Sequence, residues 1–188
     1  GLERGMTVLD VGCGSGSIMN RMAELFPRSS FEGRDLSTGA IDAARRDARE
    51  RNLSNTAFWV EDLSTFDRTA PEAAFDLVTT FDAIHDQARP LDVLKGIRRA
   101  LKPAGVYLMQ DIRASSRVRD NIAHPLGTLL YAVSCMHCMT VSLAQGGAGL
   151  GAMWGEQLTH EYLTRAGFTS IETHQLPHDL QNNWYVVR

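Results

Sequence analysis

The stretch that most constrains the fold is "VLDVGCGSGS" at residues 8–17, where an apolar run ends in an acid and three glycines follow at alternate positions. The apolar residues predict a buried strand, "TVLDVG" over 7–12, and "SIMNRMAELF" over 17–26 predicts the helix that follows. Glycine lets the backbone pass close to a ligand and adopt positive φ without steric penalty. A buried strand, a bare loop and a helix in this order are typical of nucleotide-binding α/β proteins.

The rest of the chain continues this alternation of strand and helix patterns. The expected strands cover residues 7–12, 29–36, 56–62, 75–82 and 106–112, and the expected helices 17–26, 38–52 and 90–102. Such alternation predicts a parallel sheet with helices on both faces. Near the end, a helix in "GEQLTHEYLTRAGF" precedes two further strands, 169–176 and 182–188, which we expect to form an antiparallel hairpin at one sheet edge. We predict a single domain over residues 1–188, with 113–153 as a helical insertion that acts as a lid.

Composition and charge exclude several classes of protein. The net charge of -3 gives no basic surface for nucleic acid. We expect no apolar span of 18 residues and no signal peptide, and therefore no membrane partner. Three cysteines do not suggest a disulfide scaffold, so a cytoplasmic location is expected. Because only "GLERGM" precedes the first strand, we also expect that an N-terminal segment is missing from this chain.

Three carboxylates accompany the glycines at strand ends. Asp10 precedes the loop, Asp35 ends the second strand in "GRDLS", and Asp62 ends the third in "VEDLS". In a parallel sheet these positions meet at the edge where ligands bind. An acid after the second strand can accept hydrogen bonds from both ribose hydroxyls, and one after the third from an adenine amine. One such Asp is more often a helix cap or turn residue, but three beside the glycines favour a nucleotide-like ligand.

The glycine spacing bears on which nucleotide is bound. The dinucleotide fingerprint is G-x-G-x-x-G, and here Ser17 stands where its third glycine belongs. This departure argues against NAD or FAD. A nicotinamide-dependent oxidoreductase is therefore a disfavoured alternative.

Five stretches together resemble a known family. "VLDVGCGSG", "GRDLS", "VEDLSTF", "FDLVTTFDAIHD" and "LKPAGVYLMQD", over about residues 7–112, are similar to the successive motifs of class I S-adenosylmethionine-dependent methyltransferases. The resemblance implies a Rossmann-like, doubly wound, seven-stranded sheet of order 3-2-1-4-5-7-6, with strand 7 antiparallel. It also implies S-adenosyl-L-methionine as the cofactor and S-adenosyl-L-homocysteine as its product. The departure of "LKPAG" from the commoner "LKPGG" is structural and minor.

The resemblance also assigns roles to residues. The cofactor-binding set that it implies is Asp10, Gly12, Gly14, Gly16, Asp35, Leu36, Asp62, Leu63 and Phe81. The three glycines would line the methionine moiety and the ribose, and Asp35 would hold the ribose hydroxyls. Asp62, with the backbone of Leu63, would read the adenine. Asp10 would support the loop and the amino group.

His85 is the candidate general base. It follows the fourth strand in "FDAIHDQARP", where substrate atoms usually approach in this family, and "IHD" is similar to the "HDW" of small-molecule O-methyltransferases. Gln87 replaces the tryptophan of that motif. Asp86 and Asp111 could orient His85 or stabilise its cation, and a base is needed only if the acceptor arrives protonated. The alternative is a capping or surface histidine in a polar loop.

A cluster of cysteine and histidine residues is a weak candidate for a metal site. Cys135, His137 and Cys138 in "SCMHCM" supply no fourth ligand and lie in an apolar helical run. Buried packing is the favoured interpretation, and no metal is expected. A cysteine-dependent arsenic methyltransferase stays a minor alternative within the same fold.

The substrate class follows largely by elimination. The fourth strand ends in "FDAI", without the "DPPY" or "NPPY" of enzymes that methylate nucleobase amines, and there is no "PC" nucleophile. We therefore expect methyl transfer to a small molecule, at oxygen. The alternative is a non-catalytic S-adenosylmethionine-binding or regulatory module of a larger protein, such as one fused to a winged-helix domain. A homodimer is left open.

Overall fold

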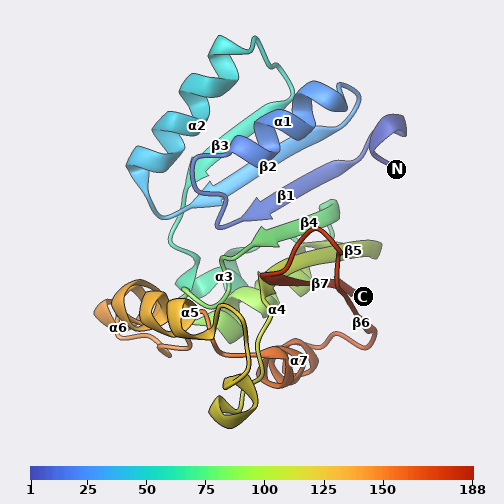
Figure 1. The fold of residues 1–188 in the computed structure, drawn as a ribbon. Coiled ribbons are helices and arrows are strands. Elements are labelled where there is room, and N and C mark those ends of the chain that lie inside the picture. The colour runs from blue at the N-terminus through green and yellow to red at the C-terminus, as the bar shows by residue number, and fades with distance from the viewer.

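Seven strands form one sheet in the computed structural model, which describes all of residues 1–188 (Figure 1). The strands are β1 (Thr7–Val11), β2 (Ser30–Asp35), β3 (Thr56–Val60), β4 (Phe75–Phe81), β5 (Leu101–Ile112), β6 (Ile171–His174) and β7 (Asn182–Val187). Their order is β3-β2-β1-β4-β5-β7-β6, and β7 is antiparallel to both of its neighbours. The predicted fold class, strand order and edge hairpin are confirmed.

The helices connect these strands on both faces. The α-helices are α1 (Ser17–Leu25), α2 (Thr38–Glu50), α3 (Phe66–Thr69), α4 (Pro90–Ala100), α5 (Gly127–Val133), α6 (Met139–Ala144) and α7 (Glu156–Arg165). Short 3-10 turns are η1 (Leu2–Arg4), η2 (Leu63–Thr65) and η3 (Val118–Asn121), and a π turn, η4 (Ser134–Cys138), joins α5 to α6. The stretch after β5 is thus helical, as expected. In contrast to the expectation, β5 begins at Leu101 and runs through "KPAG".

Alternate side chains of β1 build two hydrophobic cores, one on each face of the sheet. Val8 belongs to the core that α1 and α2 cover. Leu9 and Val11 belong to the larger core on the other face, which α3, α4 and α7 cover. All three side chains are fully buried. A strand buried on both faces needs a mostly apolar sequence, which is why this segment shows no polar alternation and why its one carboxylate, Asp10, is itself buried.

The parallel strands end together at one edge of the sheet. Asp10 pairs with Gly33 of β2 and with Thr79 of β4. Past the end of β1, the amides of Gly12 and Cys13 both donate to the carbonyl oxygen of Arg34, at 2.8 and 3.1 Å. The glycine loop is therefore fixed to the end of β2. Figure 1 shows α5 and α6 on the side of the molecule toward which these strands run.

The structure corrects one expectation about the insertion. Helices α5 and α6 and the π turn between them form one continuous helix, Gly127–Ala144, of 18 residues with mean hydropathy 1.4. The expectation that no apolar span of this length exists is therefore wrong. By length and composition alone this helix could cross a membrane, and 28% of it is buried inside the molecule. The buried positions are Gly127, Leu130, Ser134, Cys138 and Ser142, a stripe at helical spacing.

Candidate cofactor and active site

A cavity of about 250 Å³ opens at the edge where the parallel strands end. Seven of the residues expected from the sequence line it: Gly12, Asp35, Leu36, Asp62, Leu63, Phe81 and Asp86. Five others do not border it: Asp10, Gly14, Gly16, His85 and Asp111. The cavity thus gathers the ends of β1, β2, β3 and β4, which is where the ligand of a doubly wound sheet binds.

Gly12 is the glycine that borders the cavity. Its φ is +77°, and a Cβ added there would lie 2.7 Å from the Cβ of Ala83. Ala83 lines the same cavity, so the loop after β1 and the loop after β4 approach each other at this point. Only glycine permits this approach with a left-handed backbone.

The Asp35 carboxylate is held by backbone amides on both of its oxygens. Oδ2 accepts from the Gly14 amide at 2.9 Å, and Oδ1 accepts from the Ser37 amide at 2.8 Å. A carboxylate oxygen has two lone pairs, so each still has capacity to accept a hydroxyl proton. Asp35 therefore shapes the glycine loop and also lines the cavity.

Asp62, like Asp35, accepts a hydrogen bond from the backbone amide two residues further along the chain. Its Oδ1 accepts from the Ser64 amide at 2.9 Å and caps the turn η2. Leu63, the next residue, is 4% exposed and lines the cavity beside it. The capping role and the binding role expected from the sequence are compatible in one residue.

Apolar side chains flank these carboxylates. Leu36 borders the cavity and is 51% exposed. Phe81 lines the cavity beyond the glycine loop and packs edge-on against Trp184, with ring centroids 6.1 Å apart. Together with Leu63, these residues offer surface that a planar base can cover.

The cavity is acidic. Four carboxylates line it, those of Asp35, Asp62, Asp82 and Asp86, and none of its 14 lining residues is Lys or Arg. Such a field attracts a cation and repels a pyrophosphate. Asp82 has φ +49°, and burial, reinforced by the charge of Asp111, raises its pKa to about 6.

Asp10 is a buried residue of β1 and does not border the cavity. It is 3% exposed and accepts a hydrogen bond from Thr79 Oγ1 at 2.8 Å. Burial raises the pKa of Asp10 to about 7; the bond from Thr79 opposes this rise, and the charge of Asp35 adds to it. The buried position of Asp10 next to the glycine loop is compatible with its predicted role in supporting that loop. Contact between Asp10 and the amino group of a ligand stays a prediction.

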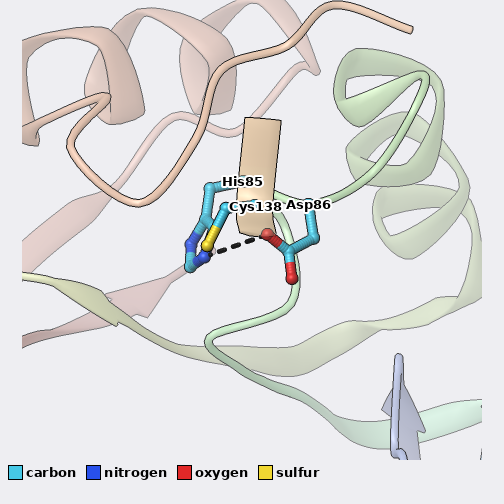
Figure 2. Close-up of side chains that lie close together, drawn as sticks. All are labelled: His85, Asp86 and Cys138. Carbon is cyan, nitrogen blue, oxygen red and sulfur yellow. Dashed lines mark ion pairs between the residues drawn. The ribbon is translucent and has the colours of Figure 1, made fainter. Parts of the chain in front are cut away.

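His85 is buried and does not border the cavity. Figure 2 shows it beside the carboxylate of Asp86 and the thiol of Cys138, and the carboxylate of Asp111 also contacts its ring. Its Nδ1 lies 2.7 Å from Asp111 Oδ1, and its Nε2 lies 3.3 Å from Asp86 Oδ1. Burial lowers the pKa of His85, but the charge and hydrogen bond of Asp111, with smaller effects of Cys138 and Asp86, outweigh it and raise the pKa to about 11. The structure thus brings the three predicted catalytic residues together, and the base role of His85 stays a prediction.

Seven residues that line the cavity were not expected from the sequence: Ser64, Asp82, Ala83, Gln87, Ala88, Val141 and Gln145. Three of them, Ser64, Asp82 and Gln87, are direct neighbours in sequence of predicted residues, and Ala83 and Ala88 lie two positions away. The motifs "EDLS" and "FDAIHD" could therefore have been extended to include these five. Val141 and Gln145 belong to α6 and its end, far along the chain. No local signal places them here.

A sheet of this order, with a glycine loop after β1 and acids at the ends of β2 and β3, defines a class I S-adenosylmethionine-dependent methyltransferase domain. Comparison with protein-family models gives the same answer, since residues 2–167 match the family described as "Methyltransferase domain". The chain belongs to this family.

Two curated relatives are similar to part of the chain. The "Ubiquinone biosynthesis O-methyltransferase" of Actinobacillus pleuropneumoniae is 30% identical over 110 residues, covering 57% of this chain and 46% of the relative. The "Fatty-acid O-methyltransferase" of Mycolicibacterium smegmatis is 31% identical over 109 residues, covering 58% of this chain and 38% of the relative. The matched region is thus about half the length of these relatives or less.

Two solved structures share the fold. A "SAM dependent methyltransferase from Aquifex aeolicus" has a TM-score of 0.70 at 18% identity, covering 100% of this chain and 84% of the other. The trans-methyltransferase CalH, solved in complex with S-adenosylhomocysteine, has a TM-score of 0.70 at 22% identity, covering 99% of this chain and 52% of the other. These likenesses concern the fold.

The residues of the cavity fit the cofactor of this class. Ribose hydroxyls need acceptors, which Asp35 provides, and an adenine ring needs apolar surface, which Leu36 and Leu63 provide. The sulfonium and the α-ammonium group of S-adenosylmethionine are both cationic, in keeping with the acidic lining.

Proposed function

We propose that this chain transfers the methyl group of S-adenosylmethionine to an oxygen of a small-molecule acceptor. The observation that carries the choice of oxygen is the similarity to curated relatives named as O-methyltransferases of small molecules. The choice of a small acceptor is supported by the cavity, which is enclosed in part by α6 and has no basic lining that would suit a nucleic acid.

In this proposal the cofactor supplies a methyl group that is already activated by its positive sulfur. The chain's residues hold that methyl group in line with the acceptor oxygen and keep water away, which accounts for much of the barrier reduction in such reactions. Asp35 and Asp62 bind the two ends of the nucleoside. Val141 and Gln145 of the α6 region cover the cavity and exclude water.

A neutral hydroxyl acceptor must lose its proton during transfer. His85 is the predicted base, and Asp111 orients its ring through the 2.7 Å contact to Nδ1. In this structure the imidazole does not border the cavity, and its pKa of about 11 keeps the ring protonated near neutral pH. The base role therefore requires a change in the loop after β4 that brings Nε2 to the acceptor and lowers this pKa. Asp86 links His85 to the cavity, because it lines the cavity and its carboxylate contacts His85 Nε2.

Isothermal titration calorimetry tests the cofactor assignment. We expect micromolar binding of S-adenosylmethionine and S-adenosylhomocysteine and no binding of NADH. The matched control for Asp35→Ala is Asp42→Ala, because Asp42 is an exposed carboxylate on α2 outside the cavity. Binding of NADH alone would refute the assignment.

A panel of phenols and hydroxy acids, followed by mass spectrometry, tests the transfer. The expected product carries one added methyl group on oxygen. Methylation at nitrogen, carbon or sulfur alone would contradict the choice of oxygen. Tight cofactor binding without transfer to any acceptor would favour the alternative of a non-catalytic binding module.

A further inference from the structure

We propose that His85, Asp86 and Cys138 form a three-ligand site for Zn²⁺ or a divalent ion of similar ligand preference. One ligand atom from each, Nε2, Oδ1 and Sγ, lies within 4.8 Å of the other two (Figure 2). The proposal does not rest on methyl transfer, since it follows from the placement of these donor atoms, although Asp86 also lines the cofactor cavity.

The spacing of the donor atoms suits a tetrahedral ion. With Zn–N and Zn–O bonds of about 2.0 Å, tetrahedral geometry places the nitrogen and the oxygen about 3.3 Å apart. The distance between His85 Nε2 and Asp86 Oδ1 is 3.3 Å. That oxygen is buried and accepts no hydrogen bond, so this contact leaves its lone pairs unused.

A buried carboxylate oxygen that accepts no hydrogen bond is costly, and the contact with His85 Nε2 is an ion pair only when the ring is protonated. A bound cation would displace the Nε2 proton and take its place beside this oxygen. His85 and Cys138 are themselves 3% and 5% exposed, so the cluster is closed to bulk water on most sides. Nitrogen, oxygen and sulfur ligands together favour zinc over magnesium or calcium, which take oxygen ligands. Three protein ligands leave one coordination position for water or another small ligand.

The surroundings of His85 are those of a metal-ligating histidine. Such a histidine almost always donates its second ring N–H to a carboxylate or carbonyl, which fixes the tautomer and the ring orientation. Here Nδ1 faces Asp111 Oδ1 at 2.7 Å, which leaves Nε2 for a metal. Asp111 is fixed in turn, because its Oδ1 also accepts from Trp154 Nε1 at 3.2 Å and from the Ile112 amide at 2.8 Å.

The π turn brings the thiol to this place. Single π turns inside α-helices occur frequently at functional sites. The turn η4 ends at Cys138, which points inward, whereas Cys135 and His137 of the same turn are exposed. The metal site suspected in "SCMHCM" is therefore not formed by that motif alone: one of its cysteines meets two ligands from the loop after β4.

Metal binding and the base role both need the lone pair on His85 Nε2, so they exclude each other. If an ion occupies Nε2, His85 cannot take a proton there. The two interpretations therefore differ in what binds, and a direct test of metal binding distinguishes them without any acceptor.

Titration of chelator-treated protein with Co²⁺ tests the proposal. We expect one equivalent to produce visible bands of a tetrahedral ion and a thiolate-to-metal charge-transfer band in the near ultraviolet, with Zn²⁺ displacing it. Cys138→Ser is expected to abolish the charge-transfer band. The matched control, Cys135→Ser, removes the exposed cysteine of the same turn and should leave the spectrum unchanged.

A second variant separates metal binding from misfolding. Asp111→Asn retains all three ligands but alters the support of His85, and is expected to weaken Co²⁺ binding by about 10- to 100-fold. S-adenosylhomocysteine binding and circular dichroism report whether each variant is folded. The proposal is overturned if the wild-type protein gives no charge-transfer band, or if Cys135→Ser, and not Cys138→Ser, removes it.

Discussion

The substitution Gly16→Ala tests how the glycine loop is packed. A Cβ at this position would lie 2.6 Å from Phe58 Cε1 and 2.7 Å from Ala44 Cβ. Phe58 is 4% exposed and Ala44 is fully buried, so neither has room to move. Overpacking of this kind costs about 1–3 kcal/mol. The backbone adds about 1–2 kcal/mol, since φ is +68° and a left-handed conformation is unfavourable for alanine.

Gly14→Ala is the matched control. Gly14 also has positive φ, +53°, but a Cβ there would meet nothing within 4 Å. Only the backbone cost of about 1–2 kcal/mol applies. The difference between the two variants is therefore about 1–3 kcal/mol, which corresponds to about 2–12 °C in Tm for a domain of this size.

Thermal unfolding by circular dichroism, without cofactor and checked by urea denaturation, measures this difference. Gly16→Ala is expected to have the lower Tm by that amount. Equal losses in both variants would refute the reasoning, because they would show that φ alone explains the cost. A larger loss for Gly14→Ala would show that the loop packs differently.

Three further predictions concern the site. Asp35→Ala weakens S-adenosylmethionine binding more than tenfold by calorimetry, because it removes the acceptor for the ribose hydroxyls; unchanged affinity would contradict the assignment. His85→Gln leaves cofactor affinity within about twofold but slows transfer to a hydroxyl acceptor, and equal rates would contradict the base role. Burial raises the pKa of Asp10 from an ordinary value of 3.8 to about 7 in the folded chain, so its contribution to stability is greatest below pH 3.8 and is lost as pH rises through 7. The stability of Asp10→Asn relative to wild type should therefore increase by about 3 kcal/mol as pH rises from 5 to 8, measured by urea denaturation; a pH-independent difference would contradict this prediction.

The fold could be predicted because its determinants are local. A strand buried on both faces needs a run such as "TVLDV", and a loop fixed to the next strand needs glycine. Asp35 and Asp62 were predictable for the same reason. Asp35 is the last residue of β2, and Asp62 lies two residues after β3. Each accepts a hydrogen bond from the amide two residues on, so its position follows from a few residues of sequence.

The surroundings of His85 were not predictable in this way. Its ring nitrogen meets Asp111, 26 residues away, and Asp111 in turn meets Trp154, another 43 residues along. These contacts depend on how β5 and the segment before α7 pack together. Sequence pattern predicts that a histidine follows β4, but not whether its ring turns toward the cavity or beneath it.

The insertion after β5 is tied to the cavity more firmly than a free lid would be. Ser142 Oγ donates to the carbonyl oxygen of Gln87 at 2.9 Å and accepts from the Gly149 amide at 3.0 Å. The Ala148 amide donates to the carbonyl oxygen of Ala88 at 3.0 Å. Each such bond contributes about 0.5–1.5 kcal/mol, so breaking the two that cross to Gln87 and Ala88 costs about 1–3 kcal/mol.

Opening the cavity by moving α6 alone thus costs more free energy than moving α6 together with the loop after β4. Gln87 and Ala88 follow directly after His85 and Asp86, so a movement that keeps these hydrogen bonds must carry the loop after β4 together with the helix. Cys138 lies on the same continuous helix. Joint movement would keep the thiol beside His85 and Asp86 while the cavity opens, whereas movement of the helix alone would take the thiol away from both.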